Sequence, residues 1–231
     1  MQHIVCDDKE FYIDSDIGIS ITLKHRENGV QVFRVEINGK NPVGNIDIII
    51  PFDMKGILST YAPTNIFKRN RMVMQWFAPT SSKSYFSFGT PFLSVVDRGN
   101  INFATVSLSD AVTDSEILFY VQDFNQEGKV EFKVRLLIGR EKFTHYEVDL
   151  RIDDNSREIS SSIKELTKWF KKYYPECLNT PDSCFAPLYS SWYNFHQHPN
   201  GILLERELKA AKEAGFGSLI IDDGWQYDGN G

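Results

Sequence analysis

The chain has 231 residues, 42% of them hydrophobic, and a formal net charge of −6 at pH 7. This length suits one large domain or two small ones, each with its own hydrophobic core. The chain is mildly acidic and has no basic stripe that could neutralise phosphates, so we expect no nucleic-acid partner. No segment approaches the roughly 20 apolar residues of a membrane-spanning helix, so we expect no membrane partner either.

The N-terminus and the cysteines favour a cytoplasmic protein. Residues 1–10 have neither the basic start nor the apolar centre of a secretory signal peptide. Cys6, Cys177 and Cys184 are an odd number of cysteines and too few for a disulfide framework. Cys177 and Cys184 could pair across a loop, but free thiols are the favoured interpretation.

Residues 10–152 follow a β-strand pattern almost throughout. Ile19, Ile21 and Leu23 alternate with polar residues, and Asn28-Gly29 is typical of a hairpin turn. The predicted strands are 19–23, 30–37, 46–50, 57–61, 72–78, 92–96, 101–108, 116–124, 129–138 and 143–152. Many short strands with no helical pattern between them predict a mainly β domain. We expect a large antiparallel β-sandwich, or supersandwich, over residues 1–153.

A helical pattern begins after residue 153, and we interpret residues 154–185 as a linker helix and a loop. Residues 154–156 offer an N-cap, and Pro175 ends the helix. Apolar residues recur on one helical face at Ile163, Leu166, Phe170 and Tyr173. We interpret Trp169 of this helix and Trp76 of the sandwich as packing residues.

Residues 186–231 predict a βαβ unit. A first strand is expected over 186–193, a helix over 202–214 and a second, parallel strand over 218–221. The helix buries a stripe formed by Leu204, Leu208 and Ala211, and Gly215 or Gly217 follows its end.

Two consecutive carboxylates, Asp222 and Asp223, follow the second strand and precede Gly224 and Trp225. The carboxyl ends of parallel strands are where α/β barrels and open α/β sheets hold ligands. Carboxylates accept charge-assisted hydrogen bonds from sugar hydroxyls, and an indole face suits the C–H side of a pyranose. Alternatively, one of the aspartates only caps the following turn, with Gly224 in a left-handed conformation.

The chain resembles the N-terminal part of glycoside hydrolase family 36, the family of α-galactosidases and raffinose-type galactosyl enzymes. The similarity rests on Ser191-Trp192-Tyr193 near the first strand and on residues 220–225, which include the Asp-Asp-Gly-Trp segment. A large β-sandwich and a helix precede these motifs in that family too. The resemblance implies that residues 186–231 are the first βαβ unit of a (β/α)₈ barrel that continues in sequence beyond them.

The resemblance also implies a retaining glycosidase that acts on terminal α-galactosides. The family residues that match Asp222 and Asp223 bind hydroxyls of the terminal galactose, and Trp192, Tyr193 and Trp225 are expected to line or neighbour the same pocket. The family's catalytic aspartates lie on later strands and match no position here. We therefore expect no catalytic residue, no metal and no cofactor in these 231 residues, which should be inactive by themselves.

Two alternatives remain open. The chain could be a non-catalytic sugar-binding or oligomerisation module, which would form a homo-oligomer, or the whole protein could transfer galactose as raffinose synthases do. His196 and His198 are spaced for a metal site, but no third ligand is evident and Pro199 marks a turn. We interpret this segment as a solvated loop.

Overall fold

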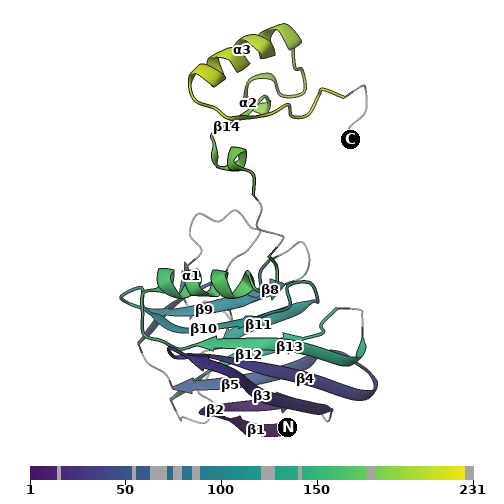
Figure 1. Ribbon diagram of the computed structural model, residues 1–231, viewed down its shortest axis with the longest axis vertical. Helices are drawn as coiled ribbons and strands as arrows, with labels where there is room; N and C mark the ends of the chain where they lie inside the picture. Colours follow the sequence, from purple (N-terminus) through teal and green to yellow (C-terminus); the bar gives the residue numbers. More distant parts are fainter. Residues whose placement is uncertain are drawn as a thin grey trace. The chain divides into compact units, whose positions relative to one another are not determined.

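The computed structural model describes residues 1–14, 17–53, 56–62, 72–74, 80–84, 89–120, 128–139, 142–175 and 180–226. The chain divides into two compact units, Met1–Tyr173 and Tyr174–Gly231 (Figure 1). Within the described ranges, every helix is too short or too polar to cross a membrane.

The described strands of the first unit form two antiparallel sheets, which confirms the predicted mainly β fold. Across the first sheet the order is β1 (Gln2–Cys6), β2 (Lys9–Asp14), β5 (Ile46–Asp53), β12 (Lys129–Leu136), β11 (Ser115–Tyr120) and β8 (Thr80–Ser84). Across the second it is β3 (Gly18–Glu27), β4 (Val30–Val43), β13 (Phe143–Asp153), β10 (Asn102–Leu108), β9 (Phe92–Asp97), β6 (Ile57–Tyr61) and β7 (Met72–Met74). The predicted hairpin joins β3 to β4, with Asn28 and Gly29 both at positive φ.

The sequence pattern misses three of these strands, β1, β2 and β8. Strand β8 is the segment Thr-Ser-Ser-Lys-Ser and lies at a sheet edge, so it lacks the apolar alternation by which strands are recognised. Strands β1 and β2 form an edge hairpin whose turn contains Asp7 at φ 57°. Of the predicted strand 72–78 the structure describes residues 72–74, and Trp76 lies outside the described residues.

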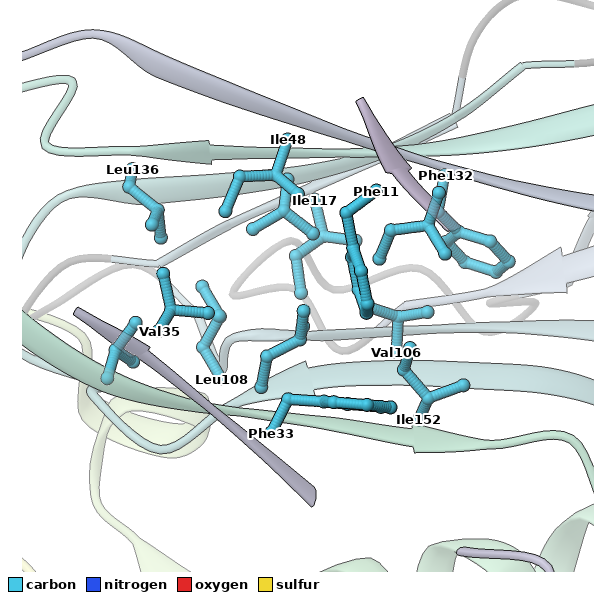
Figure 2. Close-up of a cluster of buried hydrophobic side chains, with 14 of the residues drawn as sticks. Phe11, Phe33, Val35, Ile48, Val106, Leu108, Ile117, Phe132, Leu136 and Ile152 are labelled. Carbon is cyan, nitrogen blue, oxygen red and sulfur yellow. The ribbon is translucent and has the colours of Figure 1, made fainter. Parts of the chain in front are cut away.

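The hydrophobic core lies between the two sheets. Figure 2 shows Phe11, Ile48 and Phe132 of one sheet facing Phe33 and Ile152 of the other, and all five side chains are fully buried. The rings of Phe11 and Phe33 meet edge to face, with centroids 5.1 Å apart. Burying one such side chain contributes about 1.5–3 kcal/mol, so this alternating pattern dominates the stability of the sandwich.

Helix α1 (Ile159–Phe170) packs on the outer face of the seven-stranded sheet (Figure 1). Leu166 and Trp169 are buried there against Val32 and Phe92, which confirms the packing role of Trp169. The predicted cap is wrong, because Glu158 is the N-cap residue and makes no side-chain cap.

Tertiary contacts explain why residues 154–156 do not cap α1. The Asn155 side chain donates to the backbone carbonyl of Asn28 in the β3–β4 turn. Lys9 donates to the Asp154 carboxylate at 2.6 Å, so that side chain is also engaged outside the helix. Both groups therefore fix the chain that enters α1 to the sandwich.

The second unit contains a short 3₁₀ helix (Asp182–Phe185), β14 (Leu188–Ser190), α2 (Trp192–Phe195), α3 (Gly201–Glu213) and β15 (Ser218–Ile220). Strands β14 and β15 are parallel, with Ser190 paired to Ile220. Asn200 is the N-cap of helix α3, and its side chain accepts a hydrogen bond from Leu203 N at 3.1 Å. The helix ends before Gly215, at φ 91°, and buries Leu204 and Ala211 of the predicted stripe.

Candidate functional site

Asp222 lies at the carboxyl end of β15, as predicted, and β14 holds it there. Ser191 N donates to the carbonyl of Ile220 at 3.0 Å, and Asp222 N donates back to Ser191 Oγ at 2.8 Å. Ser190 Oγ also donates to Asp222 Oδ2 at 3.3 Å. The two strands therefore end together, with the last residue of β14 and the residue after it anchoring the acid that follows β15.

Asp223 organises the turn after β15. Its Oδ1 accepts hydrogen bonds from Gly224 N at 2.9 Å and Gln226 Nε2 at 2.5 Å, and its Oδ2 accepts from Gln197 Nε2 at 2.8 Å. The bonds from Gln197 and Gln226 lower the pKa of Asp223, so the carboxylate is ionised at neutral pH. Asp223 therefore makes the contacts of a turn-capping residue, which the sequence offered as the alternative to sugar binding.

Gly224 is required where two chain segments approach closely. Its φ is +92°, a left-handed conformation that L-residues other than glycine seldom adopt. A Cβ built at this position would lie 2.2 Å from the carbonyl oxygen of Gln197 and 2.6 Å from its Cα. The turn after β15 therefore packs directly on the backbone of the α2–α3 loop.

The two carboxylates differ in how much of their hydrogen-bonding capacity is already used. A carboxylate offers about four acceptor positions. Among the described residues, Asp222 accepts from Ser190 Oγ and from Asp223 N, whereas Asp223 accepts from three donors. Asp222 is thus the better placed of the two to accept hydrogen bonds from an external ligand.

Two of the three aromatic candidates lie on a different element from the one predicted. Trp192 and Tyr193 belong to α2, so the prediction that they continue the first strand is wrong. The strand ends at Ser190, whose Oγ accepts a hydrogen bond from Trp192 N at 3.4 Å and so favours a turn over further strand. Trp192 packs edge-on against His196, and Tyr193 and Trp225 are 84% and 70% exposed. All three rings therefore present surface on which a ligand could stack.

Sequence reasoning missed four side chains that build this site: Ser190, Ser191, Gln197 and Gln226. The serines follow the first strand as Asp222 follows the second, and the register that brings them together, with Ser190 paired to Ile220, is set only when the strands pair. No local pattern marks the glutamines, whose partner Asp223 is defined only by the folded turn.

A second polar cluster holds α2 and α3 against β14. The Tyr189 hydroxyl donates to the Glu207 carboxylate, and Asn194 Nδ2 donates to the same carboxylate at 2.6 Å. The hydrogen bond to Glu207 raises the pKa of Tyr189, and the bonds from Tyr189 and Asn194 lower the pKa of Glu207. This cluster fixes the short helix that carries Trp192.

Potential metal ligands do not gather in the part of the chain that the structure describes. No group of three or more His, Cys, Asp and Glu side chains there could hold a metal ion. Cys6 and Cys184 are free thiols, and Cys177 lies outside the described residues.

Comparisons of the sequence with protein-family models and with curated proteins give no match. The resemblance to glycoside hydrolase family 36 therefore remains a prediction drawn from the motifs around Trp192 and Asp222.

Proposed function

We propose that the chain is the N-terminal portion of an α-galactosidase-like retaining glycosidase of glycoside hydrolase family 36. Its second unit would then begin the (β/α)₈ barrel, and Asp222 would bind a hydroxyl of the terminal galactose. The observation that carries this proposal is the anchored position of Asp222 at the carboxyl end of a parallel strand, beside the end of its neighbour.

The exposure of the two parallel strands supports the barrel part of the proposal. Leu188, Leu219, Ile220 and Ile221 are all 38–48% exposed. Successive residues of a strand point to opposite faces, so apolar side chains are uncovered on both faces of this sheet by the described residues. Parallel sheets in α/β proteins are normally covered on both faces, and additional strands and helices would provide that cover.

The chemistry of the aspartates supports sugar binding over catalysis by these residues. Retaining glycosidases need two carboxyl groups about 5–5.5 Å apart, one protonated and one ionised, on opposite sides of the scissile bond. Asp222 and Asp223 are adjacent in sequence, and the lowered pKa of Asp223 makes it a poor proton donor. A charge-assisted hydrogen bond to Asp222 contributes about 1.5–3 kcal/mol, enough to distinguish an axial from an equatorial hydroxyl.

A titration of the 231-residue chain with methyl α-galactoside and methyl α-glucoside, followed by NMR, tests this proposal. We expect the galactoside to shift the signals of Asp222 and the Trp192 and Trp225 indoles, with a weaker response to the glucoside. Asp222→Asn should abolish the preference, and Asp182→Asn, which changes an exposed acid of the same unit, should keep it. Equal responses to both sugars, or a preference that survives in Asp222→Asn, would contradict the proposal.

The same preparation tests the assignment of catalysis to residues outside this chain. We expect no release of nitrophenol from p-nitrophenyl α-galactoside by residues 1–231 at any pH between 4 and 8. Turnover that persists after a further purification step would show that the catalytic groups lie within the chain.

A further inference from the structure

A row of four side chains crosses the outer face of the seven-stranded sheet beneath α1. Strand register places Val32, Arg151, Ser107 and Phe92 directly opposite one another on β4, β13, β10 and β9. Opposite residues of antiparallel strands project from the same face, so all four lie on one side. Val32 and Phe92, at the two ends of the row, pack against α1. Arg151 and Ser107 are therefore enclosed between two helix contacts.

Both central side chains have an unsatisfied buried atom. Arg151 is only 2% exposed and Ser107 is fully buried, yet no described residue offers a hydrogen-bonding partner to Arg151 Nη1 or Ser107 Oγ. The two residues lie on adjacent strands, which are about 4.8 Å apart in a sheet. Leaving such donors unpaired is costly, above all for a charged guanidinium.

Two guanidinium groups meet at the one acid in the described part of the chain that contacts Arg151. Arg151 Nη2 and Arg157 Nη2 both donate to Asp153 Oδ2, at 3.2 and 2.6 Å, so two cations share one buried carboxylate. Burial lowers the pKa of Arg151 despite its contact with Asp153, as expected for a cation that is incompletely compensated. Glu165 of α1 also acts electrostatically on Arg151 and Arg157, but its side chain is half-exposed and pairs with Lys168 at 2.8 Å.

The next acid along the same face of β13 is also engaged. Asp149 is 1% exposed and accepts hydrogen bonds from Lys24 at 2.7 Å and Arg34 at 2.6 Å. It therefore pairs with two other cations, and among the described residues the acids that act on Arg151 are the buried Asp153 and the half-exposed Glu165.

We propose that a halide-sized anion, chloride under physiological conditions, binds beneath α1 between Ser107 and Arg151. It accepts hydrogen bonds from Ser107 Oγ and Arg151 Nη1, the two buried atoms for which the described residues offer no partner. An anion accepts from both donors. A water molecule could accept from Arg151 Nη1 and donate one hydrogen to Ser107 Oγ, but Val32 and Phe92, the other side chains of the row, offer no acceptor for its second hydrogen. The bound ion ties the helix-covered face of β13 to β10 and so stabilises the docking of α1.

Unfolding of the full chain in sodium chloride and in sodium gluconate at equal ionic strength tests this site. A ligand that binds only the folded state raises the unfolding midpoint with the logarithm of its concentration. We expect this rise in chloride and not in gluconate. Ser107→Ala should remove most of it, whereas Ser115→Ala should keep it, because Ser115 Oγ is equally buried and unpaired but lies in the other sheet.

Crystals grown in sodium bromide give a direct measurement of the same site. We expect an anomalous bromide peak within hydrogen-bonding distance of both Ser107 Oγ and Arg151 Nη1. A water molecule in that position, no peak at all, or identical unfolding midpoints in chloride and gluconate would each overturn the proposal.

Discussion

Replacing Gly224 by alanine tests whether the contact between the β15 turn and the α2–α3 loop shapes the candidate site. The new Cβ would collide with the Gln197 backbone at 2.2 Å, and the residue would also have to adopt φ +92°. Gly215 provides a matched control in the same unit, because its φ is +91° and nothing lies within 4 Å of a Cβ added there. The two variants share the conformational penalty, and only one adds the collision.

The expected energies follow from these two terms. The left-handed conformation costs an L-residue about 1–2 kcal/mol, and this applies to both variants. Forcing an extra carbon into a filled space typically costs a further 1–3 kcal/mol or so, and here it applies to Gly224→Ala alone. The collision can be relieved only by moving Gln197 away, which would weaken its hydrogen bond to Asp223 and let the pKa of that carboxylate rise toward its ordinary value.

Native-state hydrogen exchange of the backbone amides of β15 and Asp222 measures these local stabilities. A difference of about 1–3 kcal/mol between the variants corresponds to exchange that is about 5- to 150-fold faster in Gly224→Ala than in Gly215→Ala. Equal exchange rates in the two variants would refute the idea that the Gln197 backbone confines this turn.

Three further substitutions test the packing of both units. Asp149→Asn removes a buried carboxylate that pairs with two cations, Lys24 and Arg34. It should lower the free energy of unfolding, measured by urea titration at pH 7, by about 3–5 kcal/mol. Burial alone would raise the pKa of Asp149, but its hydrogen bonds lower it overall. The ionised carboxylate therefore stabilises the fold fully above about pH 4, and the difference in free energy of unfolding between wild type and Asp149→Asn should narrow toward pH 3. A difference that stays constant with pH would contradict this. Ser191→Ala leaves Asp222 N without its acceptor. Hydrogen exchange of the Asp222 amide should then become faster by an amount equivalent to about 1–3 kcal/mol, and an unchanged exchange rate would count against the anchoring role of Ser191. Leu166→Ala leaves a cavity beneath α1 and should lower the free energy of unfolding, measured by urea titration, by about 2–5 kcal/mol. An equal loss in Thr167→Ala, at the exposed neighbouring residue, would show that the cavity is not the cause.

The sandwich could be predicted where its strands are half-buried and could not where they lie at an edge. Strands such as β3 and β12 alternate apolar and polar residues because one face meets the core, and this period of two is visible in the sequence. Strand β8 contains only threonine, serines and a lysine, and its strand conformation depends on pairing with β11. The start of α1 was mispredicted for a similar reason, because Asn155 bonds to a turn more than 100 residues away in sequence.

The candidate site divides in the same way between local and tertiary information. An apolar run followed by Asp222 and Asp223 sufficed to predict acids at the end of a parallel strand, because both the strand and its direction are local properties of a βαβ unit. The different contacts of the two acids could not be predicted, since they depend on Ser190, Ser191 and Gln197, which come from segments that meet only in the folded chain.

The contacts of the two aspartates separate what the sequence presents as a single motif. Asp223 accepts hydrogen bonds from both sides of the turn and holds it against the α2–α3 loop, so its charge already serves the protein. Asp222 is anchored mainly through its backbone N–H and Ser190, which fixes its position while leaving part of its carboxylate for other donors. An acid that is held in place but not saturated suits the recognition of a hydroxyl, because binding then requires neither reorientation nor the loss of an internal bond. Asp223 is therefore a structural carboxylate that positions a turn, and under the proposed function Asp222 beside it is the carboxylate that binds the sugar hydroxyl.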